Sequence, residues 1–239
     1  MSHAKQRFLL RLFAVTLLFW VVIAYLILPL VWDVAERDFD VLQESPRVTQ
    51  TEDHHPGDPL NVAIEGSMDQ LKGIMTAAGW NVAVPLGLKS DVEIVVDSVL
   101  DRPDADAPVS RLFLFERQED IAFEQTVANS PRHRHHVRFW KMPQTSDTNR
   151  DIWIGSAAYD ERVGFSHTTG EITHVTAPAI DDERDYLFDC LAKTELLNER
   201  IEIPNFHTQR SGKNGGGDPW HTDGTLYIGT IDSEKIGER

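Results

Sequence analysis

The stretch RHRHHVRFW, residues 132–140, places three histidines and three arginines beside an aromatic pair. Imidazole and guanidinium groups bind metals, anions or nucleic-acid phosphates. On a β-strand, successive side chains point to opposite faces. Val137 and Phe139 are apolar and should face the core, which leaves His135 half-buried against a partner. The other face then carries a cation, an imidazole, a cation and an indole: Arg134, His136, Arg138 and Trp140.

Several interpretations of this strand remain open. Its cations can pair across strands with the many Asp and Glu residues, as surface ion pairs commonly do. The arginine-rich face with its indole can instead bind an anionic group. His133 and His135 lie two residues apart on one face and could ligate a metal, although zinc sites need a third and a fourth ligand. A nucleic-acid arm is the least favoured, for reasons of location given below.

A second group of polar residues surrounds the start of a predicted helix near residue 181. His174, Asp181 and Asp185 could form an acid/base or metal constellation, because a histidine here precedes carboxylates within one helical turn. The structural alternative is that Asp181 caps the helix, Glu183 favours its dipole and Arg184 pairs across a strand. A further alternative is that Arg184 assists anion binding.

Two helices have clear signals. In SMDQLKGIMTAAG, residues 67–79, Ser67 and Gln70 have capping-box spacing and Gly79 can end the helix. In IDDERDYLFDCLAKTELL, residues 180–197, Asp181 suits the N-cap position, and the predicted buried side comprises Leu187, Cys190, Leu191 and Thr194. A further helix is predicted over SDVEIVVDSVLD, residues 90–101, although its β-branched residues favour strand locally.

The remaining periodic segments are short predicted strands separated by turn residues, with little regular alternation of strand and helix. This order predicts an α+β domain with a largely antiparallel sheet and about three helices. The loop SGKNGGGDPWHTDG lacks the order of a phosphate-binding P-loop. No G-x-S-x-G or H-E-x-x-H motif occurs, so serine hydrolase and zincin chemistry have no support in the sequence. The strands are expected at LNVAIEG, RLFLFE, DIAFEQTV, RHHVRFWKM, DIWIGSAA, EITHVT, NERIEIP and TLYIGTID.

The N-terminal part contains one long apolar run, Leu12–Val31, which carries no charge. A helix of this length spans roughly 30 Å, the thickness of the hydrocarbon core of a bilayer. A cleaved signal peptide is the alternative, but such peptides have shorter apolar cores, and the flank here offers only Ala35 with Asp33 at the −3 position. The run therefore predicts an uncleaved signal anchor over residues 12–32.

Charge predicts the orientation of this anchor. Three basic residues lie within the N-terminal segment 1–11, whereas all 38 acids lie beyond residue 32. By the positive-inside rule the N-terminus stays in the cytoplasm. The exported part carries 20 − 38 = −18 charges, and both its location and its charge argue against nucleic acid as a partner. We expect a stalk over 33–58 that is acidic and irregular, and a globular domain over 59–239.

The single cysteine, Cys190, excludes an intramolecular disulfide and a cysteine-based metal cluster.

Six stretches occur in a recognisable order and spacing from about Asp58: GDPLNVAIEGSMDQLKGIMTAAGW, APVSRLFLFERQEDIAFEQ, RHHVRFW, DIWIGSAAYDE, ITHVTAPAIDDERDYL and GDPWHTDG. In these stretches the chain resembles the LssY C-terminal domain family, which is named after a component linked to bacterial type I secretion. The resemblance implies membrane association and supplies no activity or cofactor. Family members often carry an acid where this chain has Ala177, which weakens a metal site made from His174 and a neighbouring carboxylate.

These observations lead to two expectations. The first is a single-pass protein of the bacterial inner membrane whose periplasmic domain binds an anionic small molecule or an envelope protein, as an accessory to secretion or envelope processes. The second is a metal- or acid/base-dependent hydrolase of phosphate or ester groups that uses His135, His174, Asp181 and Asp185. Whether the protein is an enzyme is left open by the sequence.

Overall fold

The computed structural model describes residues 3–28, 39–83, 111–127, 130–165, 167, 172–232 and 235. The chain forms two compact units, Met1–Asp40 and Val41–Arg239, and each is described by itself. The helix expected over residues 90–101 lies outside the described residues.

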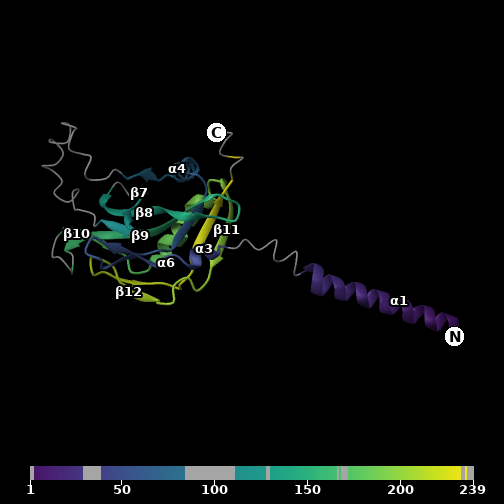
Figure 1. Cartoon of the computed structure of the whole chain (residues 1–239). Coiled ribbons are helices and arrows are strands. Elements are labelled where there is room, and N and C mark those ends of the chain that lie inside the picture. The colour runs from purple at the N-terminus through teal and green to yellow at the C-terminus, as the bar shows by residue number, and fades with distance from the viewer. Residues whose placement is uncertain are drawn as a thin grey trace. The chain divides into compact units, whose positions relative to one another are not determined.

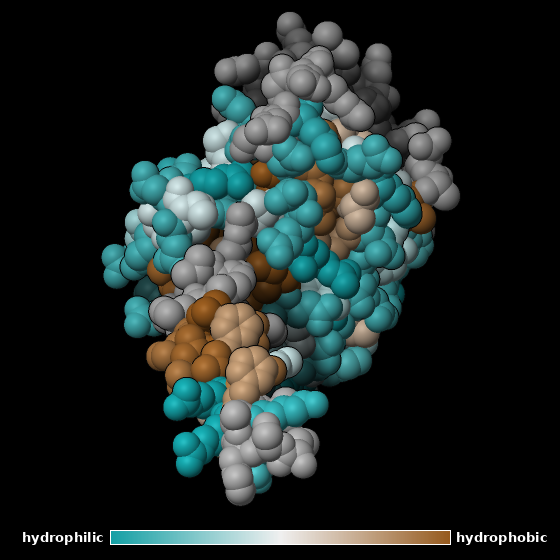
Figure 2. Space-filling view, turned by 90° about the vertical axis from the view of Figure 1, so that its right-hand side faces the viewer, coloured by the Kyte–Doolittle hydropathy of each residue, from teal (hydrophilic) through white to brown (hydrophobic). Residues whose placement is uncertain are grey.

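The first unit is an apolar helix. It consists of α1, His3–Val22, which continues as a short π-helix, η1, Ile23–Ile27. The span Lys5–Ile27 is 23 residues long, and none of it is buried inside the protein. Figure 2 shows its side chains as a brown surface with hydrophilic groups at the N-terminal end. A helix that is apolar all round and unburied has no protein core to pack into, so it suggests a membrane anchor.

The second unit is built on a large and mostly antiparallel sheet (Figure 1). Only β14 and β3 pair in parallel among its described strands. In spatial order its strands are β11 (Leu197–Ile203), β14 (Leu226–Ile231), β3 (Val62–Glu65), β9 (Asp151–Phe165), β8 (Ser130–Thr145), β7 (Ile121–Val127) and β4 (Asn81–Val82), and β10 (Ile172–Thr176) pairs with the far half of β9. The α+β class predicted from the sequence is confirmed.

Two helices, α4 (Met68–Ala77) and α6 (Ile180–Ala192), pack on one face of this sheet. The predicted capping box starts α4: the Gln70 amide N–H donates to Ser67 Oγ, and the Gln70 side chain accepts from the Ser67 amide. Gly79 ends the helix region with φ of +83°, which glycine adopts without strain. The shared core contains, from the helices and the sheet, Leu71, Ile74, Met75, Leu187, Phe188, Leu191, Phe123, Val137, Phe139 and Trp153.

The start of α6 differs from its prediction. Its N-cap is Ala179, which makes no side-chain hydrogen bond. Asp181 is not the cap, because its carboxylate accepts hydrogen bonds from Thr222 Oγ1 at 2.8 Å and from the Asp223 amide at 2.6 Å. Asp181 therefore ties the helix to a distant loop instead of closing its first turn.

The other face of the large sheet is covered by a smaller sheet and a hairpin. The smaller sheet has the order β2 (Pro56–Pro59), β1 (Val48–Thr51), β5 (Leu112–Leu114) and β6 (Arg117–Gln118). The hairpin pairs β12 (Ser211–Lys213) with β13 (Pro219–His221). Trp140 on β8 is fully buried on this face, and its indole N–H donates to the Arg117 carbonyl at 3.2 Å.

The second unit begins earlier than composition indicates. We expected an irregular stalk up to residue 58, but the compact unit starts at Val41. The short helix α3, Asp40–Gln43, leads into it, and Leu42 is fully buried. Strands β1 and β2 lie in the segment expected to be a stalk, so this segment supplies one wall of the site described next.

Candidate functional site

Strand β8 directs alternate side chains to opposite faces of the large sheet, as the sequence predicts. Val137 and Phe139 are fully buried in the core on the helix-covered face. His135 lies on that same face, where its Nδ1 is 2.7 Å from Glu183 Oε2 on α6. On the opposite face, the first three polar side chains of the predicted row line a pocket: Arg134, His136 and Arg138.

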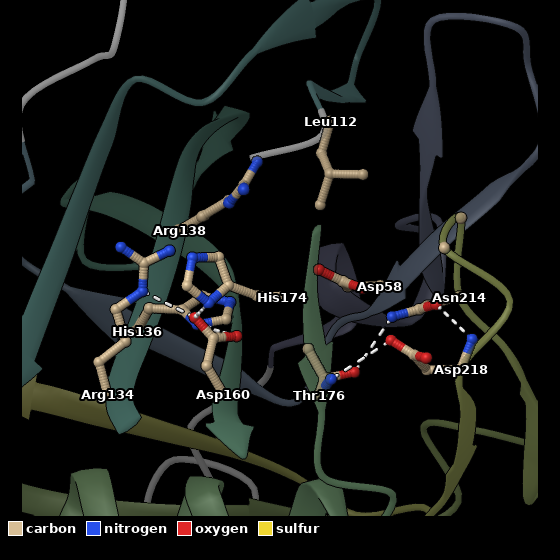
Figure 3. A pocket seen from close by; sticks show the side chains of 12 residues that line it. Asp58, Leu112, Arg134, His136, Arg138, Asp160, His174, Thr176, Asn214 and Asp218 are labelled. Carbon is tan, nitrogen blue, oxygen red and sulfur yellow. Dashed lines mark hydrogen bonds and ion pairs between the residues drawn. The ribbon is translucent and has the colours of Figure 1, made fainter. Parts of the chain in front are cut away.

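The pocket lies between the large sheet and the elements that cover it, with about 470 Å³ of empty space that is partly open to solvent. Figure 3 shows two groups of side chains facing each other across it. Its lining side chains come from β2, β5, β8, β9, β10 and the β12–β13 turn: Asp58, Leu112, Arg134, His136, Arg138, Asp160, His174, Thr176, Asn214 and Asp218, with the backbone of Gly215 and Gly216.

Asp160 is the centre of the first group, which we call the basic wall: Arg134, His136, Arg138, Asp160 and His174. Asp160 lies opposite Arg134 in the β8–β9 register, and its carboxylate is only 1% exposed. Its Oδ2 accepts from Arg134 Nε at 2.7 Å and lies 3.5 Å from His174 Nδ1. Its Oδ1 lies 3.3 Å from His136 Nδ1. One buried carboxylate thus holds three basic side chains from two neighbouring strands.

The protonation of this group follows from burial and charge. Burial alone would raise the pKa of Asp160, but the charges of His136, Arg134 and His174 outweigh it and hold that pKa far below its ordinary value. For His174, burial is the largest cause and lowers the imidazole pKa, and the nearby Arg134 and His136 lower it further against the attraction of Asp160. Asp160 is therefore ionised, and His174 is more readily neutral than an exposed histidine.

Several buried atoms of the basic wall have unmet hydrogen-bonding capacity. The contacts of His136 and His174 to Asp160 have ion-pair distances but lack hydrogen-bond geometry. Within the described part of the chain, His136 Nδ1, His174 Nδ1 and Asp160 Oδ1 have no hydrogen-bond partner. Buried polar atoms are almost always paired with protein, water or ligand. The two Nδ1 atoms face the Asp160 carboxylate at 3.3 and 3.5 Å, so this unmet capacity lies within the basic wall itself.

The two arginines of the basic wall also contact acids on the far side of β8. Arg134 NH1 is 3.2 Å from Glu124 Oε2 on β7, and Arg138 NH1 is 3.7 Å from Glu119 Oε1. Arg138 is only 6% exposed. These acids fix the positions of the guanidinium groups beside the pocket and partly neutralise them.

The opposite group, which we call the acidic wall, consists of Asp58, Thr176, Asn214 and Asp218. Asp218 is 3% exposed, and its Oδ2 accepts from the Thr176 amide at 3.3 Å. Asn214 Nδ2 donates to Thr176 Oγ1 at 3.1 Å, and Asn214 Oδ1 accepts from the Asp218 amide at 2.9 Å. These bonds clamp the β12–β13 turn to the end of β10, so the wall is preorganised.

Asp58 stands on β2 in the acidic wall. Burial is the largest cause acting on its carboxyl and raises its pKa, and the charge of Asp160 raises it further, although Arg138 and His136 act in the opposite direction. No sequence signal marked Asp58, because it lies in a polar stretch, GDP, that has the composition of a linker. The same is true of Asp218 and Asn214, which reach the pocket only through long-range packing.

Trp140 is not a pocket residue. We expected its indole to offer a stacking surface, but the ring is fully buried under β6 and its N–H is bonded to a backbone carbonyl. The apolar contribution to the pocket comes from Leu112 instead.

The histidines expected to bind a metal have other surroundings. His135 is held by Glu183 and stacks on Tyr186 with ring centroids 4.0 Å apart, and His133 stacks loosely on Tyr159 at 6.5 Å. Burial raises the pKa of Glu183, against the hydrogen bond from His135. Among the described residues, no group of three His, Cys, Asp or Glu side chains is arranged to hold a metal ion.

The expected catalytic group around α6 does not converge with the histidines. His174 belongs to the basic wall, whereas His135 lies on the opposite face of the sheet. Asp181 and Asp185 both bind Arg184, with contacts of 3.1 Å and 2.9 Å. Arg184 is 2% exposed and also binds Asp223, so it supports the fold at the start of α6 and does not line the pocket.

Comparison with known proteins decides the family. The model described as LssY C-terminus matches residues 42–226, which is most of the chain. The chain belongs to the LssY C-terminus family. No curated protein and no solved structure matches it. The matched range begins where the second unit begins, so the LssY C-terminus domain includes β1 and β2 as well as the large sheet.

In this LssY C-terminus domain, Ala177 donates its amide N–H to the Tyr159 carbonyl at 2.8 Å and closes the end of β10 on β9. The carboxylate beside His174 comes from Asp160 on the neighbouring strand. The missing acid at position 177 therefore does not leave His174 without an acidic neighbour.

Proposed function

We propose that the LssY C-terminus domain binds a small molecule through an anionic group, which enters the pocket beside His136, Arg138 and His174. The observation that carries this proposal is the convergence of two arginines and two histidines from two strands around one partly open pocket. Guanidinium and imidazolium groups are the usual partners of phosphate and carboxylate groups. Both imidazoles turn their Nδ1 atoms toward Asp160, which holds the two rings beside the pocket.

The N-terminal apolar helix fits a membrane-anchored protein. The family has no defined function that conflicts with this. Beyond this, we propose that the helix remains uncleaved in a bacterial inner membrane, with the basic N-terminus in the cytoplasm and the domain in the periplasm. The ligand would then be an envelope molecule or an anionic group on an envelope partner. The protein would act as an accessory to secretion or envelope processes.

Titration calorimetry of the full chain in detergent with inorganic phosphate tests the binding proposal. Arg138→Gln should weaken binding about tenfold or more, because a charge-assisted hydrogen bond is lost. Arg200→Gln is the matched control, since Arg200 is an exposed arginine on β11 that pairs with Glu202. Equal affinity of Arg138→Gln and the control, with unchanged circular dichroism in both variants, would reject the assignment.

One observation favours a second candidate, acid/base hydrolysis of a phosphate ester in the same pocket. A carboxyl group with a raised pKa, Asp58, and an imidazole with a lowered pKa, His174, both line it. Such paired shifts are typical of acid/base sites. Release of p-nitrophenol from p-nitrophenyl phosphate that is lost in both Asp58→Asn and His174→Gln would support hydrolysis, and no release by the native chain would count against it.

A further inference from the structure

The charge of the pocket does not suit an anion alone. Its lining contains two arginines and three aspartates, so with neutral histidines the fixed charges sum to 2 − 3 = −1. Part of the arginine charge is also balanced by Glu124 and Glu119. A ligand with only negative charge would be repelled by Asp58 and Asp218 as it approached the basic wall.

The two kinds of charge are separated in space. Figure 3 shows the basic side chains around Asp160 on one side, and Asp58, Asn214 and Asp218 on the other. Asp160 is matched by Arg134 and the two imidazoles. Asp58 and Asp218 form no ion pair with a basic side chain in the part of the chain that the structure describes. The acidic wall is therefore a set of hydrogen-bond acceptors, preorganised by the Asn214 and Thr176 contacts, that faces the basic wall.

We infer that the pocket takes a small dipolar phosphate ester, whose phosphate binds His136, Arg138 and His174 and whose ammonium group binds Asp58 and Asp218. This inference rests on the proposed function and names the ligand class for the same site. These three basic side chains from β8 and β10 line the pocket, and a phosphate group offers three terminal oxygens to them where a carboxylate offers two. An ammonium group at the other end donates hydrogen bonds and pairs its charge with the Asp58 and Asp218 carboxylates.

The protonation of Asp58 fits this ligand. Its pKa is raised mainly by burial, and a cation bound beside the carboxyl would lower that pKa again. Binding of the ammonium end therefore favours the ionised form of Asp58.

O-phosphoethanolamine is the probe, and inorganic phosphate and phosphocholine are the comparison ligands. Calorimetry at pH 7 on the full chain in detergent should give at least about tenfold tighter binding of O-phosphoethanolamine than of phosphate, since a charge-assisted bond adds that much. Phosphocholine, whose nitrogen has no N–H, should lie between them. Asp58→Asn should abolish most of the preference while phosphate affinity stays equal or rises.

Asp53→Asn is the matched control, because Asp53 is an exposed acid five positions before Asp58 and does not line the pocket. It should keep the preference. Phosphate binding without any preference for O-phosphoethanolamine, or a preference that Asp58→Asn leaves intact, overturns the dipolar ligand and leaves the proposed function standing. Absence of binding by all three ligands overturns both.

The dipolar ester could be a free metabolite or a lipid headgroup, and the same measurement separates them. In nanodiscs of phosphatidylethanolamine, a headgroup that reaches the pocket should compete and weaken O-phosphoethanolamine binding relative to nanodiscs of phosphatidylglycerol. Equal affinity in the two lipids assigns the ligand to the soluble form. Both results support the ligand class and differ only in its source.

Discussion

At the scale of single residues, the site depends on one buried aspartate. Asp160 accepts a 2.7 Å bond from Arg134 and attracts two imidazoles from β8 and β10. The strand pattern was sufficient to place Arg134, His136 and Arg138 on one face, because side-chain alternation is a local property. Asp160 and Asp58 carry no local signal, since both lie among other acids or turn residues, and only pairing between distant strands brings them to the pocket.

The buried imidazole of His174 makes anion binding depend on pH. The charged groups that act on His174 are Asp160 on β9, Arg134 and His136 on β8, and Glu124 on β7, and burial is the largest effect and lowers its pKa. A bound anion raises that pKa, so binding takes up a proton, and affinity rises as the pH falls through the pKa of the bound state and levels off below the lowered pKa of the free state. Sulfate affinity should therefore increase below about pH 6.5, by no more than about tenfold per pH unit for one proton.

Sulfate is a suitable probe because it does not titrate in this range, and calorimetry between pH 5 and pH 8 would measure the effect. In His174→Gln the rise should shrink. A sulfate affinity that is constant over this range in the native chain would contradict a role for the imidazoles in anion binding.

At the scale of elements, the least predictable feature is how α6 is attached. The apolar spacing predicted the helix, and Leu187, Leu191 and Thr194 are buried as expected, whereas Cys190 is only half-buried and the helix ends at Ala192. The cap prediction was wrong because Asp181 had a stronger alternative, the Thr222 hydroxyl and the Asp223 amide from a loop 41 and 42 residues further along. Three strands of the smaller sheet, β1, β2 and β6, were missed for a related reason, since they are two to four residues long and mostly polar, whereas the apolar β5 lies within the predicted strand RLFLFE.

Arg184 is the centre of this attachment. Its guanidinium group donates to Asp223 Oδ1 and Oδ2 at 3.0 and 3.1 Å and to the Thr225 carbonyl at 2.8 Å, and it lies 4.1 Å from the centroid of Tyr227. Burial opposes the charged form, but the bonds to Asp223 and Asp185 outweigh it and raise the pKa of Arg184. Arg184→Ala should lower the free energy of unfolding by about 3 kcal/mol, the usual cost of removing one partner of a buried pair.

Denaturant unfolding of the full chain in detergent, followed by tryptophan fluorescence, measures this loss. Arg200→Ala is the matched control, since Arg200 also lies over Tyr227, at 4.7 Å, but is exposed and should cost less than about 1 kcal/mol. If the two variants lose equal stability, the buried cluster does not hold α6 as described.

At the scale of the whole molecule, composition alone separates an uncharged apolar helix from a strongly acidic domain. This separation was predictable from residues 12–31. A helix of twenty uncharged residues has no polar face to turn toward water, so it does not suit the surface of a water-soluble domain. The start of the domain was less predictable, since residues 41–58 look like a linker by composition and are held by long-range contacts, among them those with β5 and β12.

Membrane attachment is tested on the full chain by alkaline extraction of membranes. The native chain should remain in the membrane pellet. Leu17→Lys combined with Leu18→Lys should release it, because each charge near the centre of a spanning helix costs about 2.5–3.5 kcal/mol on insertion scales. Leu17→Ile combined with Leu18→Ile is the control and should stay in the pellet. Release of the native chain by alkaline extraction would count against the anchor.

The orientation is tested by protease added outside spheroplasts, which should cleave the second unit. Cleavage that occurs only after the cytoplasm is opened would reverse the proposed topology.

Strand β8 places His135 against Glu183 in the core and its neighbour His136 in the pocket. An insertion or deletion of a single residue upstream in this strand would exchange the two faces, because the side-chain period is two. Two guanidinium groups would then enter the apolar core while Val137 and Phe139 faced the ligand. The number of residues between the start of β8 and Arg138 is therefore constrained more tightly than the identity of most residues within it, and length variation in this domain should be confined to segments outside the strands.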